Sequence, residues 1–351
     1  MVLVMAPWNY PFMLTMEPVI GAVAAGNCVV AKPSAYSPAT SAIIKKILEK
    51  VFEEEYVTVV EGGRAENTEL LEQKFDYIFF TGGVTVGRLV MEKASRHLTP
   101  VSLELGGKSP CVIDKTANLK LAAKRLAFGK YLNLGQTCVA PDYLLIDQEI
   151  KDEFLKIFID TVKKMYGDSP LDNKDYGKMI NEKHYTRVMG FIDREKVVLG
   201  GQGREDELRI EPTILDHVAA EDAVMQEEIF GPILPVLTYA KLEEAVKFIE
   251  ERPHPLALYI FSNDKKVQKY FTEKLAFGGG CINDTVLHLA TSRMGFGGVG
   301  NSGMGAYHGI QSFRTFTHEK SILKKYNWID MPMRYQPYST FYDKVVRMFL
   351  R

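Results

Sequence analysis

The chain of 351 residues is long enough for two domains of ordinary size, each with its own core. Its hydrophobic share of 46%, charged share of 25% and net charge of −1 are those of an ordinary globular protein, so nothing indicates binding to nucleic acid. Four scattered cysteines form no C-x-x-C pair, which argues against a disulfide framework or a metal site and favours a reducing, cytoplasmic location.

The apolar start of the chain contains Pro7, Pro11 and Pro18 and has no Lys or Arg before Lys32. It therefore fits neither a signal peptide nor a membrane-spanning helix. We expect no integral membrane segment.

The first hundred residues alternate short β-branched runs with segments of helical period. The runs at 2–5, 28–32, 57–61 and 76–80 predict buried strands. A helix is predicted to begin after Ser37, with one apolar face made of Ile43, Ile44, Ile47, Leu48 and Val51. Strand, helix and strand at this spacing are typical of a parallel, doubly wound α/β sheet.

The same alternation restarts after VSLELGG (101–107) and predicts a second α/β domain. Its strands are expected at 111–114, 142–146, 196–201, 233–239 and 256–262, and its helices at 119–131 and 241–251. The glycine-rich stretch 295–305 is too dense for a helix or strand and predicts a loop or a close backbone approach. After residue 330 the pattern becomes aromatic and irregular.

FFTGGVTVG (79–87) predicts a strand that runs into a glycine turn and then a helix from about Thr85. Such a turn directs backbone N–H groups and a helix dipole toward one point, which suits a phosphate. The spacing from Gly82 to Gly87 matches neither the dinucleotide fingerprint nor a Walker loop. A plain turn therefore stays open as the alternative.

ELGGKSP (104–110) contains Gly-Lys-Ser, but Ser102 stands where a phosphate-binding loop needs a glycine. What remains is Glu104, a lone carboxylate at the end of an apolar strand. Ligands bind at such strand ends, and burial there raises the pKa of a carboxylate toward that of a useful base. A solvated or ion-paired glutamate is the alternative.

Four other positions have both a chemical and a plain interpretation. Lys32 follows the second predicted strand at the ligand edge of the sheet, and Asn9 follows the first, where its amide could donate to an oxyanion. A surface lysine and a turn asparagine are the alternatives. Glu228, in EEIFGP (227–232), could be a solvated acid, and Cys138, in GQTC (135–138), could be core packing or a nucleophile.

Taken in order, seven motifs resemble the aldehyde dehydrogenase superfamily. They are PWN (7–9), KPS (32–34), FTGG..VG (80–87), LELGGKSP (103–110), GQTC (135–138), EEIFGP (227–232) and FGGVGNSGMG (296–305). The flanking stretches, such as TPVSLELGGKSPCVID and GQTCVAPDYLL, resemble the class 3 branch of fatty and aromatic aldehyde dehydrogenases. The resemblance covers residues 2 to about 325.

The resemblance implies a chemical role for three residues. Cys138 would attack the aldehyde as a thiolate, and Asn9 would share the resulting oxyanion with the backbone N–H of Cys138. Oxidation would leave a thioester, and Glu104 would activate the water that hydrolyses it to the carboxylic acid.

The resemblance also implies an NAD or NADP site and an aldehyde pocket. The cofactor would be bound by Lys32, Thr81, Gly82, Gly87, Glu228 and Phe230. Tyr10 would line the aldehyde pocket. Strictly NAD-dependent relatives carry a glutamate three residues after the KPS lysine, and this chain has Ala35 there, so NADP is expected to be tolerated.

The implied fold is a Rossmann-like nucleotide-binding domain (1–102), an α/β catalytic domain (103–311) and an oligomerisation strand with a tail (312–351). The strand would lie near 312–318 and join two subunits of a homodimer. Family members place further structure before the PWN strand, so the first domain is expected to be N-terminally incomplete.

Two other functions stay open. The same thiol and base could serve a cofactor-independent thioesterase or acyl-transfer enzyme, but Lys32, the Gly82 turn and Glu228 would then have no purpose. A non-catalytic or inactive fragment of the fold is the third reading, although Asn9, Glu104 and Cys138 are all present.

Overall fold

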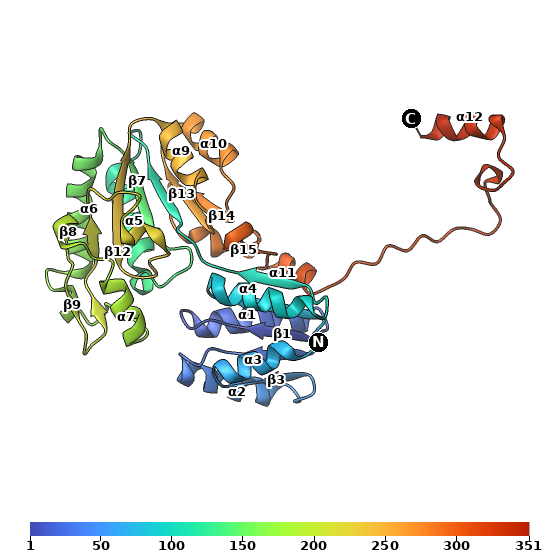
Figure 1. Ribbon diagram of the computed structural model, residues 1–351, viewed down its shortest axis with the longest axis horizontal. Helices are drawn as coiled ribbons and strands as arrows, with labels where there is room; N and C mark the ends of the chain where they lie inside the picture. The colour runs from blue at the N-terminus through green and yellow to red at the C-terminus, as the bar shows by residue number, and fades with distance from the viewer. Residues whose placement is uncertain (351) are drawn as a thin grey trace. The chain divides into compact units, whose positions relative to one another are not determined.

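The computed structural model describes residues 1–350 and forms two compact units, Met1–Thr317 and His318–Arg351. The first unit contains two large sheets, both α/β in character (Figure 1). The predicted α/β fold is confirmed, and it contains two sheets.

The first sheet has six strands in the order β15-β5-β4-β1-β2-β3. Its strands are β1 (Val2–Met5), β2 (Val29–Lys32), β3 (Val57–Val59), β4 (Tyr77–Thr81), β5 (Val101–Glu104) and β15 (Gly303–Met304). β1 to β5 pair in parallel, and β15 pairs antiparallel with β5. The strands predicted at 2–5, 28–32, 57–61 and 76–80 are therefore confirmed.

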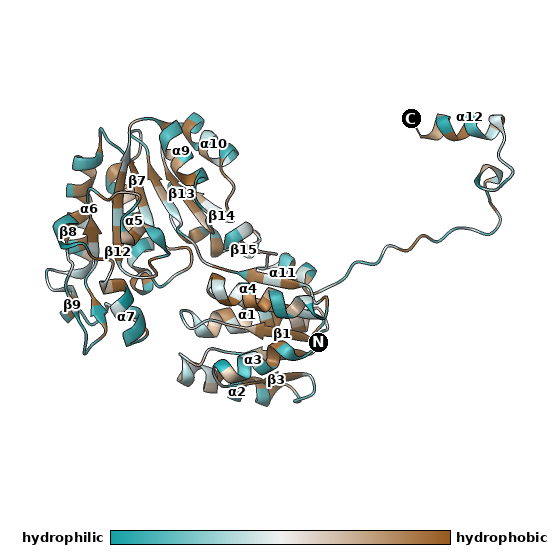
Figure 2. Cartoon of the chain, viewed as in Figure 1, coloured by the Kyte–Doolittle hydropathy of each residue, from teal (hydrophilic) through white to brown (hydrophobic). Residues whose placement is uncertain are grey.

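Both faces of this sheet are buried, as parallel sheets require. Val2 and Val4 belong to one apolar cluster, which includes residues of the helices α1 (Pro11–Ala24) and α2 (Pro38–Val51). Leu3 and Met5 belong to another, with residues of α3 (Arg64–Glu72) and α4 (Val84–Ser95). Side chains alternate between the two faces of a strand, so an apolar strand such as VLVM supplies both cores. Figure 2 shows the hydrophobic colouring along these strands.

The second sheet has seven strands in the order β14-β13-β6-β7-β12-β11-β8. Its strands are β6 (Pro110–Ile113), β7 (Tyr143–Asp147), β8 (Val197–Leu199), β11 (Thr213–Leu215), β12 (Ile233–Tyr239), β13 (Ala257–Phe261) and β14 (Gly279–Ile282). β8 alone among them runs antiparallel to its neighbour, β11. A small separate ribbon joins β9 (Gly203–Arg204) and β10 (Arg209–Ile210).

The helices around the second sheet divide between its two faces. They are α5 (Leu119–Tyr131), α6 (Lys151–Tyr166), α7 (Glu182–Met189), α8 (Ala223–Gln226), α9 (Leu242–Glu250) and α10 (Lys265–Lys274). Residues of α5 and α6 pack in the cluster that also contains Val2 and Val4, so this apolar core is continuous between the two sheets. Residues of α7, α9 and α10 pack in a cluster of their own on the opposite face.

The chain passes between the sheets at two glycine-rich segments. It leaves β5 through Gly106 and Gly107 toward β6, and it returns through 297–302 to β15. Gly303 has φ +144°, and a Cβ there would lie 2.1 Å from the carbonyl oxygen of Leu103. The close backbone approach predicted for 295–305 is therefore present, and only glycine permits it.

Two expectations about buried side chains were wrong. In α2, Ile44 and Leu48 are buried, but Ile43 and Val51 are exposed, because the helix packs along a narrower stripe than the predicted face. Cys28 lies just before β2 and is exposed, whereas Cys111 is buried as expected.

The segment 312–318, expected as a strand, is largely helical: α11 spans Ile310–Thr315 and packs against α1. Gly21 of α1 permits this contact, because a Cβ there would lie 2.9 Å from the Cβ of Ser312. The domain boundaries and the oligomerisation role of this region stay predictions.

The second unit, His318–Arg351, contains a short 3-10 turn at Pro332–Arg334 and the helix α12 (Thr340–Phe349). Ser339 caps α12 by accepting a hydrogen bond from the backbone N–H of Tyr342 (3.2 Å). The aromatic, irregular sequence after residue 330 did not predict α12. In the part of the chain that the structure describes, no helix is long and apolar enough to cross a membrane.

Candidate active site

The carboxyl ends of four strands of the first sheet meet at one edge. Met5 pairs in register with Lys32 and with Phe80, and Thr81 pairs with Glu104. Ligands bind at this edge of an open parallel sheet, beside the strand where the order reverses, which here is β1 between β4 and β2. The sheet therefore places Lys32, Thr81 and Glu104 along the predicted ligand edge.

Lys32 is buried at the end of β2, and its ammonium group donates to the carbonyl oxygens of Pro33 (2.9 Å) and Gly62 (2.7 Å). Burial lowers the pKa of Lys32, against the opposing effect of Glu66 and Glu61. Lys32 is thus a positioned cation and not the solvated surface lysine of the alternative interpretation.

The glycines of FFTGGVTVG have packing reasons of their own. A Cβ at Gly82 would lie 2.5 Å from the ring of Phe80, and one at Gly87 would lie 2.6 Å from the side chain of Leu105. Gly87 therefore lets α4 approach the end of β5 closely. The helix begins at Val84, so its N-terminus faces the same edge of the sheet.

The GQTC segment forms a strained turn after α5. Asn133, Leu134 and Gly135 all have positive φ, of 49°, 54° and 71°. A Cβ at Gly135 would lie 2.3 Å from the carbonyl oxygen of Gly231, so glycine is required where EEIFGP approaches. Such strain is concentrated at functional sites.

Asn9 and Tyr10 are bonded to this turn. The amide of Asn9 donates to the carbonyl oxygen of Gln136 (3.0 Å), and the Tyr10 hydroxyl is 2.7 Å from the Thr137 hydroxyl. One N–H of the Asn9 amide is left over from this bond, since an amide carries two. The segment PWNY is therefore held beside Cys138.

Cys138 is half-buried in a setting that disfavours its charged form. Burial, followed by the neighbouring carboxylates of Glu228 and Glu104, raises the pKa of the Cys138 thiol to about 12. The backbone N–H groups of Cys138 and Val139 act in the opposite direction. The resting thiol is therefore protonated at neutral pH and needs a base before it can act as a nucleophile.

Glu104 ends β5 with a side chain only 3% exposed. Both of its carboxylate oxygens lack a hydrogen-bond partner among the described residues, and burial raises the pKa of Glu104 well above its ordinary value. A buried carboxylate left without partners is costly for folding alone and suits a general base.

Glu228 lies directly against the Gly106-Gly107 turn. A Cβ at Gly106 would lie 2.1 Å from the Glu228 carboxylate, and the backbone N–H of Gly107 stabilises its charged form. Burial first, and then Asp142, raises the pKa of Glu228 to about 8. Phe230 of the same loop has φ +48° and packs edge-on against Trp8 at 5.4 Å.

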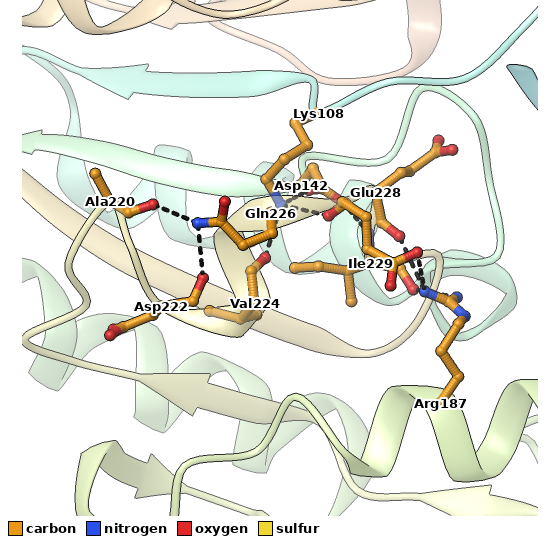
Figure 3. A network of polar contacts seen from close by, with 10 residues as sticks. Lys108, Asp142, Arg187, Ala220, Asp222, Val224, Gln226, Glu228 and Ile229 are labelled. Atoms are coloured by element: carbon orange, nitrogen blue, oxygen red, sulfur yellow. Dashed lines mark hydrogen bonds and ion pairs between the residues drawn. The ribbon is translucent and has the colours of Figure 1, made fainter.

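A network of polar contacts fixes this loop (Figure 3). Asp142 forms an ion pair with Lys108 (2.5 Å) and accepts from the backbone N–H of Ile229 (3.0 Å). Lys108 also donates to the carbonyl oxygens of Val224 and Glu227. The motifs ELGGKSP, GQTCVAPD and EEIFGP are therefore joined through one buried carboxylate.

A second cation holds the loop from the α7 side. Arg187 donates to the carbonyl oxygens of Glu228 (3.1 Å) and Ile229 (2.7 Å) and forms an ion pair with Glu227 at 3.5 Å. Sequence reasoning missed both Asp142 and Arg187. The sequence feature that could have indicated Asp142 is a carboxylate that stands between Pro141 and the apolar strand run 143–146.

A cleft of about 600 Å³ borders these elements, which is within the usual size of small-molecule sites. Its lining includes Val84 at the start of α4, Gly106, Gly107, Lys108 and Glu227. The described residues that line it do not include Cys138. Within the described residues no group of three or more His, Cys, Asp or Glu side chains could hold a metal ion.

The family model for the aldehyde dehydrogenase family matches residues 1–322. The chain belongs to the aldehyde dehydrogenase family. Among curated relatives, this aldehyde dehydrogenase is 48% identical over 350 residues to 4,4'-diaponeurosporen-aldehyde dehydrogenase of Staphylococcus aureus, covering 99% of the chain and 76% of that protein. It is 48% identical over 324 residues to the dimeric NADP-preferring aldehyde dehydrogenase of Rattus norvegicus, covering 92% and 72%. These relatives place it close to the class 3 branch.

Solved structures confirm the fold of this aldehyde dehydrogenase. The substrate-bound state of Staphylococcus aureus AldH superposes with a TM-score of 0.96 at 48% identity, covering 100% of this chain and 77% of that one. An indole-3-acetaldehyde dehydrogenase in complex with NAD+ superposes with a TM-score of 0.84 at 29% identity, covering 92% and 67%. The chain thus covers part of the length of these proteins.

Asp142→Asn tests the network. Removing the charge leaves the Lys108 ammonium, whose side chain is only 12% exposed, without its counter-ion. We expect the free energy of unfolding to fall by about 3–5 kcal/mol. Urea unfolding followed by tryptophan fluorescence measures this, because Trp8 packs against Phe230.

The matched control for Asp142→Asn is Glu149→Gln. Glu149 pairs with Lys115 at 3.7 Å on the surface, with side chains 67% and 55% exposed. Its loss should change the free energy of unfolding by no more than about 1 kcal/mol. Equal effects of the two substitutions would contradict a stabilising role for the buried network.

Proposed function

We propose that this aldehyde dehydrogenase oxidises hydrophobic aliphatic or aromatic aldehydes to carboxylic acids with NAD or NADP, through a thiohemiacetal and a thioester on Cys138. The observation that carries the proposal is the convergence of three segments on one turn. Asn9 is bonded to the carbonyl of Gln136, and Glu104 is close enough to raise the pKa of the Cys138 thiol. A nucleophile, an oxyanion donor and a base are thereby brought together.

Cys138, Asn9 and Glu104 have different roles in the proposed reaction. Cys138 loses its thiol proton to solvent and forms the bond to the aldehyde carbon, and the free N–H of Asn9 and the backbone N–H of Cys138 stabilise the oxyanion. Glu104 takes a proton from the water that attacks the thioester, and the thiol of Cys138 leaves. Its burial, which raises the pKa of the carboxyl group, suits a base working near neutral pH.

The residues present fit a nicotinamide dinucleotide, which when bound would accept the hydride. The buried hydroxyl of Thr81 lacks a partner among the described residues, and the start of α4 lies beside it. Lys32 holds a buried ammonium at the same edge, and Glu228 is cradled by Gly106. The cofactor would be bound by Lys32, Thr81, Gly82, Gly87, Glu228 and Phe230.

The aromatic ring of Tyr10 beside the thiol turn supports an apolar substrate. Tyr10, bonded to Thr137, would complete the pocket. One relative is named 4,4'-diaponeurosporen-aldehyde dehydrogenase, so its name assigns it an aldehyde substrate.

Substituting the proposed nucleophile and the proposed base separates oxidation of the aldehyde from hydrolysis of the thioester. Cys138→Ala should abolish cofactor reduction by a medium-chain aldehyde, measured as absorbance at 340 nm. Glu104→Gln should allow an initial burst and then lower the steady rate by about 10²–10⁴-fold, because the thioester is no longer hydrolysed. Cys28→Ala is the control, because this exposed thiol lies away from the site and its loss should leave the rate unchanged.

The same assay can contradict the proposal. A folded wild-type protein that reduces neither NAD nor NADP would refute dehydrogenase activity. Ester hydrolysis without any cofactor, lost in Cys138→Ala, would favour the thioesterase interpretation instead.

The exposed Ala35 supports tolerance of NADP, because no carboxylate stands three residues after Lys32. The ratio of kcat/KM for NAD to that for NADP should therefore stay well below a thousandfold, which would correspond to about 4 kcal/mol. Ala35→Glu should raise the KM for NADP by repelling its 2′-phosphate and affect NAD much less. A thousandfold preference of the wild type for NAD would contradict the expectation.

We also propose that the protein is a homodimer, since the rat relative is named as dimeric. We propose in addition that the chain divides into a nucleotide-binding domain (1–102), a catalytic domain (103–311) and an oligomerisation segment with a tail (312–351). A monomeric mass of the purified protein by light scattering would contradict the dimer.

A further inference from the structure

The helix α12 has an apolar face that the described part of the chain leaves uncovered. This face consists of Phe341, Val345, Met348 and Phe349, whose spacing places them on one side of a helix. No residue of α12 is buried, and Phe341, Met348 and Phe349 are 68%, 69% and 78% exposed. Figure 2 shows both hydrophobic and hydrophilic residues along this helix. A contiguous exposed apolar face of this kind marks an interaction site.

The helix α9 shows how an amphipathic helix of similar length behaves elsewhere in this protein. It buries Ala245, Val246 and Ile249 in the core cluster on one face of the second sheet. Its first turn contains the acidic residues Glu243 and Glu244. Packing inside the described chain therefore accounts for the apolar face of α9 but not for that of α12.

The other side of α12 is polar and mainly basic. It carries Lys344 and Arg347, and Arg347 forms an ion pair with Asp343 at 2.9 Å. Residues 318–351 contain seven Lys or Arg side chains and three Asp or Glu side chains, although the whole chain has a net charge of −1. This unit is thus net basic and the rest of the chain is net acidic, an asymmetry that indicates an anionic partner.

Exposed aromatic side chains accompany these charges. Tyr326 and Trp328 are both exposed, and they follow directly after Lys324 and Lys325. Trp and Tyr favour the boundary between water and lipid, where Lys and Arg reach the headgroups. Lysine is depleted at the interfaces between proteins. The combination therefore favours a lipid surface over a second protein.

We propose that α12 is an interfacial helix that lies along a membrane surface containing anionic lipids. Phe341, Met348 and Phe349 enter the boundary with the acyl chains, and Lys344 and Arg347 face the headgroups. Trp328 lies at the boundary between lipid and water. This association involves surface contact alone and is independent of the aldehyde chemistry.

The test is sedimentation of the purified protein with lipid vesicles, without aldehyde or cofactor. Vesicles of phosphatidylcholine are compared with vesicles of equal parts phosphatidylcholine and phosphatidylglycerol. We expect binding to the anionic vesicles only, and weaker binding as the ionic strength rises, because salt screens the attraction. The double substitution Phe341→Ser and Phe349→Ser should weaken binding by about tenfold or more. Lys344→Gln with Arg347→Gln should also weaken it by about tenfold or more.

Two matched controls lie outside this unit. Leu98→Ser removes an exposed apolar side chain just after α4. Lys265→Gln with Lys266→Gln removes two exposed charges from α10. Both proteins should bind the anionic vesicles as the wild type does.

Several results would overturn the proposal. They are a wild type that stays in the supernatant with anionic vesicles at low ionic strength, and equal binding to both kinds of vesicle. A Phe341→Ser and Phe349→Ser protein that keeps its vesicle binding but loses mass in light scattering would assign the face to a second copy of the chain. Because no activity is measured, each result is distinct from a failure of the proposed dehydrogenase function.

Tryptophan fluorescence provides a measurement that leaves α12 unsubstituted. The chain has two tryptophans, so Trp328→Phe identifies the signal of Trp328 by difference. Anionic vesicles should shift the emission of Trp328 to shorter wavelength, because its exposed ring leaves water. Phosphatidylcholine vesicles should not. An emission that anionic vesicles leave unchanged would contradict the proposed position of Trp328 at the lipid boundary.

Discussion

The site depends on one buried carboxylate, that of Asp142. It joins Lys108 from the turn after β5 to the backbone N–H of Ile229 in the loop before β12. An ion pair of this kind stabilises a structure only when both partners are in place and each remaining polar atom is bonded. The network meets that condition, since Lys108 also donates to two carbonyl oxygens. The loop that carries Glu228 is therefore fixed against the turn at Gly106.

Near Asp142, acidic side chains outnumber basic ones in a small volume that is poorly solvated. Burial raises the pKa of Glu104, Glu228 and the Cys138 thiol, and the two carboxylates raise the pKa of the thiol further. Burying these groups lowers the stability of the fold, but it gives them pKa values that suit proton transfer near neutral pH. Shifted pKa values of this kind distinguish an active site from a structural cluster of ion pairs.

Backbone constraints set the geometry as firmly as the charges do. The positive φ of Gly135 and its approach to Gly231 leave no space for a side chain, and Gly106 leaves space only for the carboxylate of Glu228. Asn9 is tied to the same turn through Gln136. Because these contacts join a loop of the first sheet to loops of the second, the reacting groups are held by both layers of the fold.

The sequence by itself determined most strands of the two sheets, though not β11, β14 or β15, and it singled out Cys138, Glu104 and Asn9 as candidates, because strand patterns and short motifs are local properties. It did not determine which side of α2 is buried, that Cys28 is exposed, or that residues 310–315 form a helix, because these depend on what packs against each element. It also gave no sign that Asp142 binds the backbone N–H of Ile229, which lies 87 positions away in the chain. Only the tertiary structure brings such charges together, since the free energy of a buried charge depends on its neighbours in space.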